Sequence, residues 1–361
     1  RSWGIDNFAW SFAQPISVNL HDFTSFDGDK SISEIERIVF ADGEIIISSD
    51  GTSIITNDQA NVVDVGAADG PLYVFGNGGD DQFNISLAVT SIDGGEGADS
   101  LAFVSPKTNL VLDLTSGIGH LSSDQGQSQF TVANVERIVG TVNDDSISGG
   151  DGDDVLKGGD GWDWLYGNGG NDFLRGGAGA DELRGGSGDD VLHVDGADMV
   201  LDGGEGMDTL YVEGPAGVTI GPGAGIEIAF GNVGDDVFDG SDLTVAAEFS
   251  GGAGADQLTG GSGWDRLTGG SGDDVIDGGV GDDVIAGGAG VDVAVFGGNQ
   301  SDYTFASSAD GLSVTVTEVG SGDVDVVSLI AGCRRECHAV ARFCGNQNPA
   351  FASTRPPANQ F

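Results

Sequence analysis

The chain has 361 residues, 65 of them glycine, and carries 58 acidic against 13 basic side chains, for a net charge of −45. That charge excludes nucleic acid as a partner and disfavours docking to an anionic membrane, because both surfaces repel it. No run of about 18 apolar residues is present, so no membrane span is predicted. Low hydrophobicity with high net charge makes disorder the first alternative to a folded chain.

In chain order the composition changes several times, and each change marks a predicted segment. The predicted segments are a β-rich N-terminal flank (1–75), a short degenerate repeat segment with a β-rich lead-in (76–139), a first repeat array (140–211), a spacer with one isolated repeat (212–250), a second array (251–295), a β-rich closing segment (296–330) and an atypical tail (331–361).

The tail differs from everything before it. It contains no aspartate and holds all three cysteines, Cys333, Cys337 and Cys344. Together with His338 these could be drawn as a zinc site, but their spacing is not that of a standard one. We therefore interpret the tail as foreign to the pattern of the rest of the chain and predict that it is disordered.

The arrays repeat every nine residues, as in the three consecutive units from residue 158, which are GGDGWDWLY, GNGGNDFLR and GGAGADELR. The pattern is G-[GN]-x-G-x-D-x-U-x, where U is a large apolar residue, and fifteen units carry its aspartate at position six. Glycine at positions one, two and four permits tight turns, and x-U-x reads as a three-residue strand whose middle side chain points inward. Two units then form one coil. The stacked coils bury a thin core, with a row at Leu156, Leu165, Leu174, Leu183 and Leu192.

A helix is excluded, because a nine-residue apolar period gives no stripe at 3.6 residues. The position-six aspartates fall at the ends of turns, so they line the edges of the stacked coils, where bare carboxylates would repel one another. Calcium fits such edges, because it accepts six to eight oxygen ligands in flexible geometry and glycine turns expose carbonyl oxygens. Magnesium demands stricter geometry, and zinc is disfavoured because the repeats contain one histidine, His193, and no cysteine.

The nonapeptide resembles the calcium-binding repeat of RTX (hemolysin-type) secreted bacterial proteins. The resemblance implies an all-β fold, a parallel β-roll or right-handed β-solenoid, in which each calcium ion lies between two turns on one edge. It also implies export by type I secretion machinery and folding outside the bacterial cell. The metal ligands that it implies are Asp154, Asp163, Asp172, Asp181, Asp190, Asp256, Asp265, Asp274 and Asp283, with Asp81, Asp99, Asp145, Asp208, Asp236 and Asp292 at less regular repeats.

If each ion lies between alternate units, a run of n units should hold n − 2 ions. This gives about four ions in the run from 140 and about three in the run from 251. Binding of these ions should be cooperative with folding.

Catalysis is not predicted, since no H-E-x-x-H, G-x-S-x-G or P-loop pattern occurs. The leading hypothesis is thus a secreted calcium-binding protein without enzymatic activity. The alternative is the C-terminal export and folding portion of a larger secreted enzyme (protease, lipase or epimerase) or of an adhesin. Trp162, Trp164 and Trp264 could stack on sugars, although edge packing is the commoner role for such residues. No specific protein or glycan partner is predicted.

Overall fold

The computed structural model describes residues 16–19, 37–39, 44–47, 53–65, 72–85, 89–104, 108–123, 126–309, 311–328 and 342–344. Across these residues the protein is built from β-strands, with one short 3-10 helix at Gln300–Asp302. No helix in the described part is long and apolar enough to cross a membrane. The two cysteines at 333 and 337, and His338, lie outside the described residues, as does most of the predicted tail.

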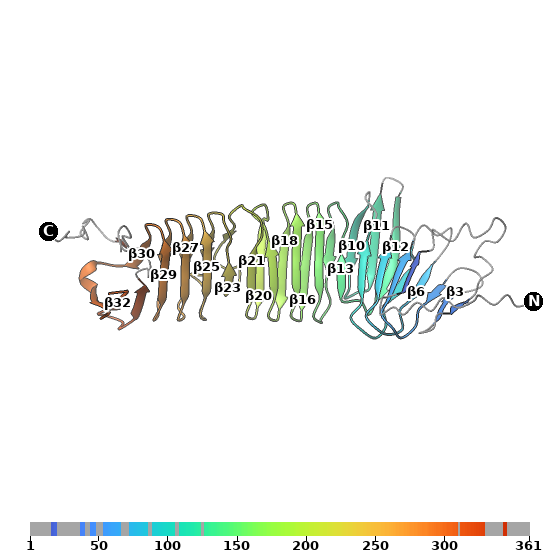
Figure 1. Cartoon of the computed structure of the whole chain (residues 1–361), viewed down its shortest axis with the longest axis horizontal. Coiled ribbons are helices and arrows are strands. Elements are labelled where there is room, and N and C mark those ends of the chain that lie inside the picture. The colour runs from blue at the N-terminus through green and yellow to red at the C-terminus, as the bar shows by residue number, and fades with distance from the viewer. Residues whose placement is uncertain are drawn as a thin grey trace, which may run out of the picture. The chain divides into compact units, whose positions relative to one another are not determined.

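The chain forms two compact units, which Figure 1 shows as stacks of strands. Unit 1 comprises residues 1–150 and 154–161, and unit 2 comprises residues 151–153 and 162–361. In both units successive strands alternate between two faces of a coil, so that strands two apart in the chain pair side by side in parallel.

In unit 1 the first face carries six parallel strands. In order these are β1 (Ile16–Asn19), β5 (Asn61–Val65), β7 (Gln82–Ile85), β9 (Ser100–Phe103), β13 (Arg137–Val139) and β15 (Val155–Asp160). The second face includes two antiparallel excursions, which interrupt the parallel coil. Its order is β2 (Arg37–Val39), β3 (Glu44–Ile47), β4 (Ser53–Ile55), β6 (Tyr73–Phe75), β8 (Ser91–Asp93), β12 (Gly126–Ala133), β11 (Ile118–Ser123), β10 (Asn109–Asp113) and β14 (Ser146–Ser148).

In unit 2 the first face is an unbroken series that ends in an antiparallel cap. Its order is β17 (Phe173–Ala178), β19 (Val191–Val194), β21 (Thr209–Val212), β23 (Ile228–Phe230), β25 (Glu248–Ala253), β27 (Arg266–Ser271), β29 (Val284–Ala289), β33 (Val324–Ser328), β32 (Ser313–Glu318) and β31 (Tyr303–Ser307).

The second face of unit 2 is split into two separate groups of strands. The first group is β16 (Trp164–Gly169), β18 (Glu182–Ser187) and β20 (Val200–Glu205). The second is β22 (Thr219–Ile220), β24 (Val237–Asp239), β26 (Gln257–Thr259), β28 (Val275–Asp277), β30 (Val293–Gly297) and β34 (Arg342–Cys344).

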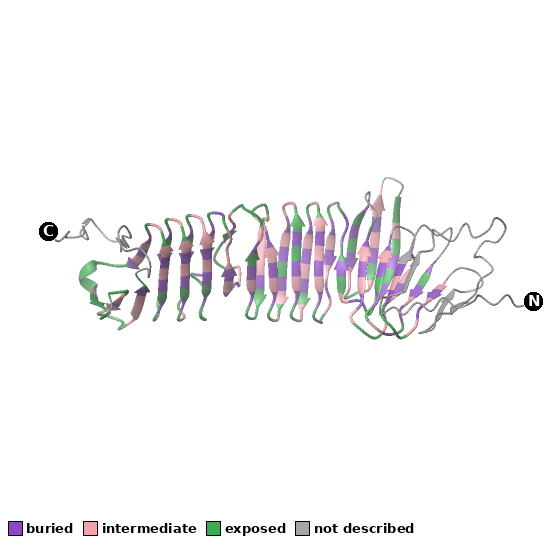
Figure 2. Cartoon of the chain, viewed as in Figure 1, coloured by how far each residue is buried: buried purple, intermediate pink, exposed green. Residues whose placement is uncertain are grey.

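The core follows the nine-residue period. Leu165 pairs with Leu183, and Leu174 with Leu192, each 18 residues on along the same face. These four side chains have no solvent exposure, and each buried leucine contributes on the order of 1.5–3 kcal/mol. Buried residues form bands across neighbouring strands in Figure 2, with partly exposed residues on either side. The predicted parallel β-solenoid with one inward apolar row per face is confirmed.

Glycine is required where equivalent turns stack. Gly270 has φ +120° and Gly288 has φ +103°, and a Cβ on either would lie under 3.0 Å from the carbonyl oxygen of the glycine 18 residues before it. L-residues rarely adopt this backbone conformation, and no side chain fits in that space. Turn stacking, more than turn formation alone, thus explains the glycine content of the arrays.

Candidate metal centre

The position-six aspartates form a hydrogen-bonded ladder along each edge. The backbone N–H of Asp163 donates to Oδ1 of Asp181 at 2.8 Å, and that of Asp256 donates to Oδ1 of Asp274 at 2.9 Å. In each case the residue after the later aspartate makes a return hydrogen bond to the earlier one. The N–H of Glu182, which follows Asp181, donates to the carbonyl oxygen of Asp163 at 2.8 Å. One carboxylate oxygen of each aspartate therefore ties its coil to the coil before it.

The second carboxylate oxygen defines what we call an open carboxylate: a position-six aspartate whose Oδ2 is buried and accepts no hydrogen bond. Oδ2 lies against the position-one glycine of the same turn. A Cβ on Gly269 would lie under 3.0 Å from both Oδ2 of Asp274 and the carbonyl oxygen of Gly287 in the next coil. Two oxygens therefore converge where that glycine has no side chain. The open carboxylates among the described residues are Asp81, Asp99, Asp181, Asp190, Asp208, Asp256, Asp274 and Asp283.

Four other aspartates have what we call closed carboxylates, in which Oδ2 accepts the N–H of position two of the same turn. Gly261 donates to Asp265 at 2.7 Å and Gly150 to Asp154 at 2.6 Å. The same contact joins Thr141 to Asp145 and Asn232 to Asp236.

The four closed carboxylates have one feature in common. In each case the preceding coil on the same edge lacks the full glycine turn. Oδ1 of Asp265, for example, accepts the N–H of Ala247, which stands where a full turn has aspartate. At the open carboxylates position two has positive φ instead, as at Gly270 (+120°) and Gly279 (+89°). A closed carboxylate is thus found only after a turn that lacks the full set of glycines. Asp81 is the exception among the open carboxylates, since the turn before it, at 56–61, contains no glycine.

Three predicted ligands fall outside these two classes. Asp163 and Asp172 are buried at the same motif position, and position two of each turn, Gly159 and Asn168, has positive φ. Asp292, in the last unit of its array, is 8% exposed, and its Oδ1 accepts the N–H of Asp274 at 3.2 Å.

Burial raises the pKa of the open carboxylates, because desolvation disfavours the charged form. The pKa of Asp208 rises to about 7, through desolvation first and then through the charges of Asp190 and Glu227. Desolvation likewise raises the pKa of Asp283 to about 7 and that of Asp274 to about 6. Without a cation, these sites disfavour their own ionised state at neutral pH.

The donor set fits calcium. Among the described residues no group of three or more His, Cys, Asp or Glu side chains converges as a metal site. An ion at these edges would therefore take backbone carbonyl oxygens together with carboxylate oxygens, which is an all-oxygen set. The converging Oδ2 and glycine carbonyl of successive turns supply that set, and the unpartnered Oδ2 atoms are the groups that a cation would satisfy.

Comparison with protein families agrees with this geometry. The model of the RTX calcium-binding nonapeptide repeat (4 copies) matches residues 139–174, 166–198, 175–210, 248–276 and 259–294. The chain carries RTX calcium-binding repeats. These RTX repeats include the turns of both predicted arrays. They do not include the units at 76, 94 and 231, whose aspartates nonetheless join the same ladders.

Other comparisons add little. No curated protein matches the chain. Among 22 matching solved chains is the crystal structure of extracellular lipase LipA from Serratia marcescens, at 19% identity and a TM-score of 0.20. The match covers 79% of this chain and 38% of the lipase chain, so this chain spans well under half of that protein.

The structure adds ladder residues that the RTX motif does not predict. Glu136 and Glu227 accept the N–H of Asp99 and Asp208, each at 2.8 Å. Asp325 accepts the N–H of Asp283 at 3.2 Å, although β31 and β32 separate the two residues in the chain. The signal for Asp325 was present in the sequence, since GSGDVDVVS from 320 keeps the aspartate and the apolar residue of the repeat.

The unit VDGADMVLD from 194 departs from the RTX repeat in a different way. Its acid, Asp198, stands one position early, yet accepts the N–H of Asp181 at 3.1 Å and that of Asp195 at 2.7 Å. Desolvation raises the pKa of Asp198 to about 7. Leu201 of the same unit is only partly buried. It belongs to β20, which is the last strand of its group.

A second ladder explains the frequent acid at position five. Oδ1 of Asp153 accepts the N–H of Asn171 at 2.7 Å, Oδ1 of Asn171 accepts that of Asp189 at 2.7 Å, and Oδ1 of Asp189 accepts that of Met207 at 2.9 Å. Each position-five side chain accepts a backbone N–H from the coil that follows it. Each position-six aspartate instead accepts a backbone N–H from the coil before it. Paired acids such as Asp189 and Asp190 therefore link three successive coils.

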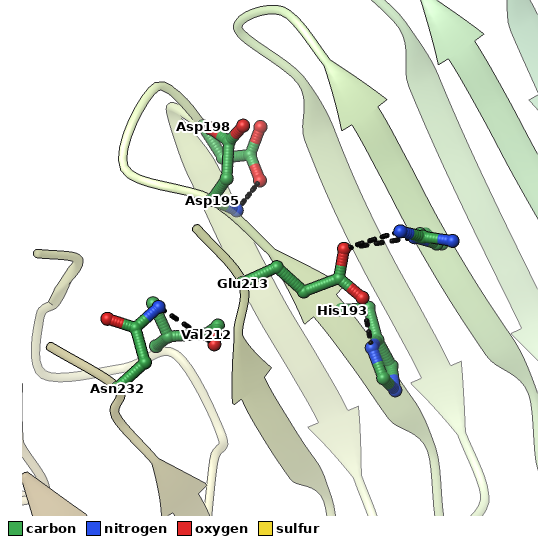
Figure 3. A network of polar contacts seen from close by, with 7 residues as sticks. His193, Asp195, Asp198, Val212, Glu213 and Asn232 are labelled. Carbon is green, nitrogen blue, oxygen red and sulfur yellow. Dashed lines mark hydrogen bonds and ion pairs between the residues drawn. The ribbon is translucent and has the colours of Figure 1, made fainter. Parts of the chain in front are cut away.

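Away from the turns, polar and aromatic side chains form contacts of their own. On the outer surface of β17, β19 and β21, the Glu213 carboxylate binds Nδ1 of His193 at 2.9 Å and the Arg175 guanidinium at 2.7 Å (Figure 3). Trp162 stacks on Trp164 with ring centroids 5.8 Å apart, and Trp264 is 75% exposed. None of these residues lies among the ladder carboxylates.

Proposed function

We propose that this chain is a secreted bacterial β-roll that binds several calcium ions at the edges of its coils and completes its fold by binding them outside the cell. The observation that carries this proposal is the set of eight open carboxylates, each with a buried Oδ2 against the position-one glycine of its turn. At five of them a carbonyl oxygen of the next coil lies beside the same glycine. The chain's net charge of −45 supports it, since compaction without cations concentrates that charge.

The energetics favour many weak sites over one strong site. A ligand that binds only the folded state stabilises it by RT ln(1 + [L]/Kd), about 1.4 kcal/mol per site when the ion is tenfold above Kd. Extracellular calcium modules have Kd values of roughly 10⁻⁴ to 10⁻³ M. Several sites acting together therefore make folding cooperative in calcium over the extracellular range, while the chain stays unfolded at low calcium.

Export by type I secretion machinery and the absence of enzymatic activity belong to the same proposal. A chain that unfolds at low calcium suits export in an unfolded state. The acids of the repeats serve as ladder and turn groups, which supports a binding role without catalysis.

The test is circular dichroism of the full chain, first in chelator and then during titration with calcium, with magnesium as the matched control. We expect a largely disordered spectrum in chelator and a steep gain of β signal with calcium, weak or absent with magnesium. A β spectrum that chelator leaves unchanged would contradict the proposal.

A further inference from the structure

Two turns in the protein are shortened versions of the RTX turn. In a full turn, the N–H of the position-one glycine donates to a backbone carbonyl oxygen in the next coil. The accepting residue is the last one before that coil's own turn begins, as when Gly76 donates to the carbonyl of Asp93 at 2.8 Å. Gly94 makes this contact with Ala133 at 3.0 Å, and Gly203 makes it with Ala224 at 2.7 Å. The turns that follow are therefore only three residues long: 134–136 in unit 1 and 225–227 in unit 2.

The two short turns have the same design. Each begins with a residue of positive φ, Asn134 at +52° and Gly225 at +59°. Each continues with a buried β-branched residue, Val135 or Ile226. Each then ends in glutamate and enters a strand in register, with Ile138 opposite Leu101 and Ala229 opposite Leu210.

Glutamate compensates for the missing residues. Its extra methylene lets Oε2 reach the amide that an aspartate accepts in a full turn, namely Asp99 for Glu136 and Asp208 for Glu227, each at 2.8 Å. The ladder is thereby continuous through a turn that has half the usual length. The recurrence of one design in both units argues that glutamate is selected for this turn.

Each short turn also faces an open carboxylate. Oδ2 of Asp208 is buried without a hydrogen-bond partner, and Asp208 has no solvent exposure. A Cβ on Gly203 would lie under 3.0 Å from both this Oδ2 and the carbonyl oxygen of Gly225.

The corresponding group in unit 1 is the same. Oδ2 of Asp99 is buried and unpartnered, and a Cβ on Gly94 would lie under 3.0 Å from that oxygen and from the carbonyl oxygen of Asn134. The converging oxygens of the full turns are thus reproduced beside both glutamates.

We propose that Glu136 and Glu227 are calcium ligands, and that each short turn forms an ion site with the open carboxylate before it. Asp99, Glu136 and the carbonyl of Asn134 supply the site in unit 1. Asp208, Glu227 and the carbonyl of Gly225 supply the site in unit 2. This inference rests on the proposed calcium-binding function and extends it to turns that the RTX motif does not describe.

The rival reading makes glutamate a plain hydrogen-bond acceptor. Glutamine would serve that purpose equally well, and without a second negative charge beside a buried aspartate. Glu227 is 5% exposed and its charge acts on Asp208. Two buried carboxylates at one turn are costly unless a cation lies between them.

The experiment compares bound calcium per chain, by equilibrium dialysis and calorimetry, in the wild-type full chain and in Glu227→Gln. The matched control is Glu248→Gln, which removes the charge of an exposed acid 21 residues further on. Glutamine keeps the acceptor for the Asp208 amide, so the fold is retained, and circular dichroism at saturating calcium checks this. We expect Glu227→Gln to bind one ion fewer, the double variant Glu136→Gln/Glu227→Gln two fewer, and Glu248→Gln the wild-type number.

Unchanged stoichiometry and affinity in both glutamate variants would overturn the inference while leaving the proposed function intact. If the wild-type chain itself binds no calcium, the proposed function fails first. If Glu227→Gln does not fold even in saturating calcium, Glu136→Gln in the other unit decides the matter by the same count.

Discussion

Turns with open carboxylates and turns with closed carboxylates differ although their aspartates occupy the same motif position. Asp265 and Asp274 stand in neighbouring units with nearly identical letters, GGSGWDRLT and GGSGDDVID. Oδ2 of Asp265 accepts the amide of Gly261, whereas Oδ2 of Asp274 accepts no hydrogen bond. The difference arises 18 residues earlier, because Ala247 precedes Asp265 on its edge and Asp256 precedes Asp274. In the second array a carboxylate is thus open to an ion where two glycine turns stack.

The largest effect on this comparison should come from pH. The open carboxylates have a raised folded-state pKa, about 7 at Asp208 and Asp283 and about 6 at Asp274, against an ordinary value near 4. In the calcium-free chain their contribution to stability is full below about pH 4 and is lost as pH rises through 7. Metal-free protein should therefore gain β signal between pH 8 and pH 5, as circular dichroism would record.

In excess calcium the direction reverses, because protons compete with ions for the same oxygens. The calcium concentration at half-maximal folding should rise as pH falls from 8 to 5. A midpoint independent of pH would argue that the open carboxylates do not bind the ions.

The next largest effect should come from adding a methyl group at a turn that stacks on another turn. Gly269→Ala places Cβ under 3.0 Å from Oδ2 of Asp274 and the Gly287 carbonyl, which should cost about 1–3 kcal/mol and weaken calcium binding. Gly152→Ala is the matched control, since no atom lies within 4 Å of its Cβ, and it should change stability by about 0.5 kcal/mol or less. Urea unfolding in calcium measures both, and equal effects would remove the case for stacking.

Removal of one carboxylate charge separates the two turn classes directly. Asp274→Asn should lower the number of bound ions by one, while Asp265→Asn should leave it unchanged, as calorimetry would show. In chelator the sign differs, because Asp274→Asn removes an unpaired buried charge and should stabilise residual structure. Equal ion loss in the two variants would contradict the division into open and closed carboxylates.

Much of the fold could be predicted from the repeat, because its period is the period of the structure. Leucines such as Leu165 and Leu183 take the same inward position in every coil, so an apolar residue every nine residues predicts both strand and core. Asp265 shows the limit of such reasoning. It is the aspartate that the motif requires at position six, but its hydrogen bonds depend on the preceding coil, which contains Ala247.

The ladder glutamates were missed for a related reason. A search that requires the motif's glycines at positions one, two and four finds nothing at VANVERIV or GAGIEIAF. The usable signal was glutamate directly before a three-residue apolar strand, with an apolar residue before it, as at Val135-Glu136 and Ile226-Glu227. The letters E-R-I-V of residues 136–139 occur again at 36–39, where Glu36 lies outside the described residues.

The smallest effect concerns the backbone at position two, which differs between the classes. Asn77, in the open turn of Asp81, has φ +63° and donates from Nδ2 to the carbonyl of Thr56 at 2.5 Å. Thr141, in the closed turn of Asp145, donates from Oγ1 to that aspartate at 3.0 Å. Asn77→Thr should cost about 1–2 kcal/mol, because a β-branched residue is strained at positive φ. The Thr141 hydroxyl also accepts the N–H of Asn143 at 3.1 Å, and Thr141→Asn should cost only these hydroxyl contacts, about 0.5–1.5 kcal/mol.

The reciprocal pair tests whether backbone conformation itself distinguishes the turns. Glycine at either position provides the control, since it accepts both conformations: Asn77→Gly should be less destabilising than Asn77→Thr, and Thr141→Gly should be no better than Thr141→Asn. Urea midpoints in saturating calcium measure all four variants. If threonine were tolerated equally at 77 and 141, the positive φ of the open turn would carry no energetic weight. The separation of the two classes would then rest on the carboxylate hydrogen bonds alone.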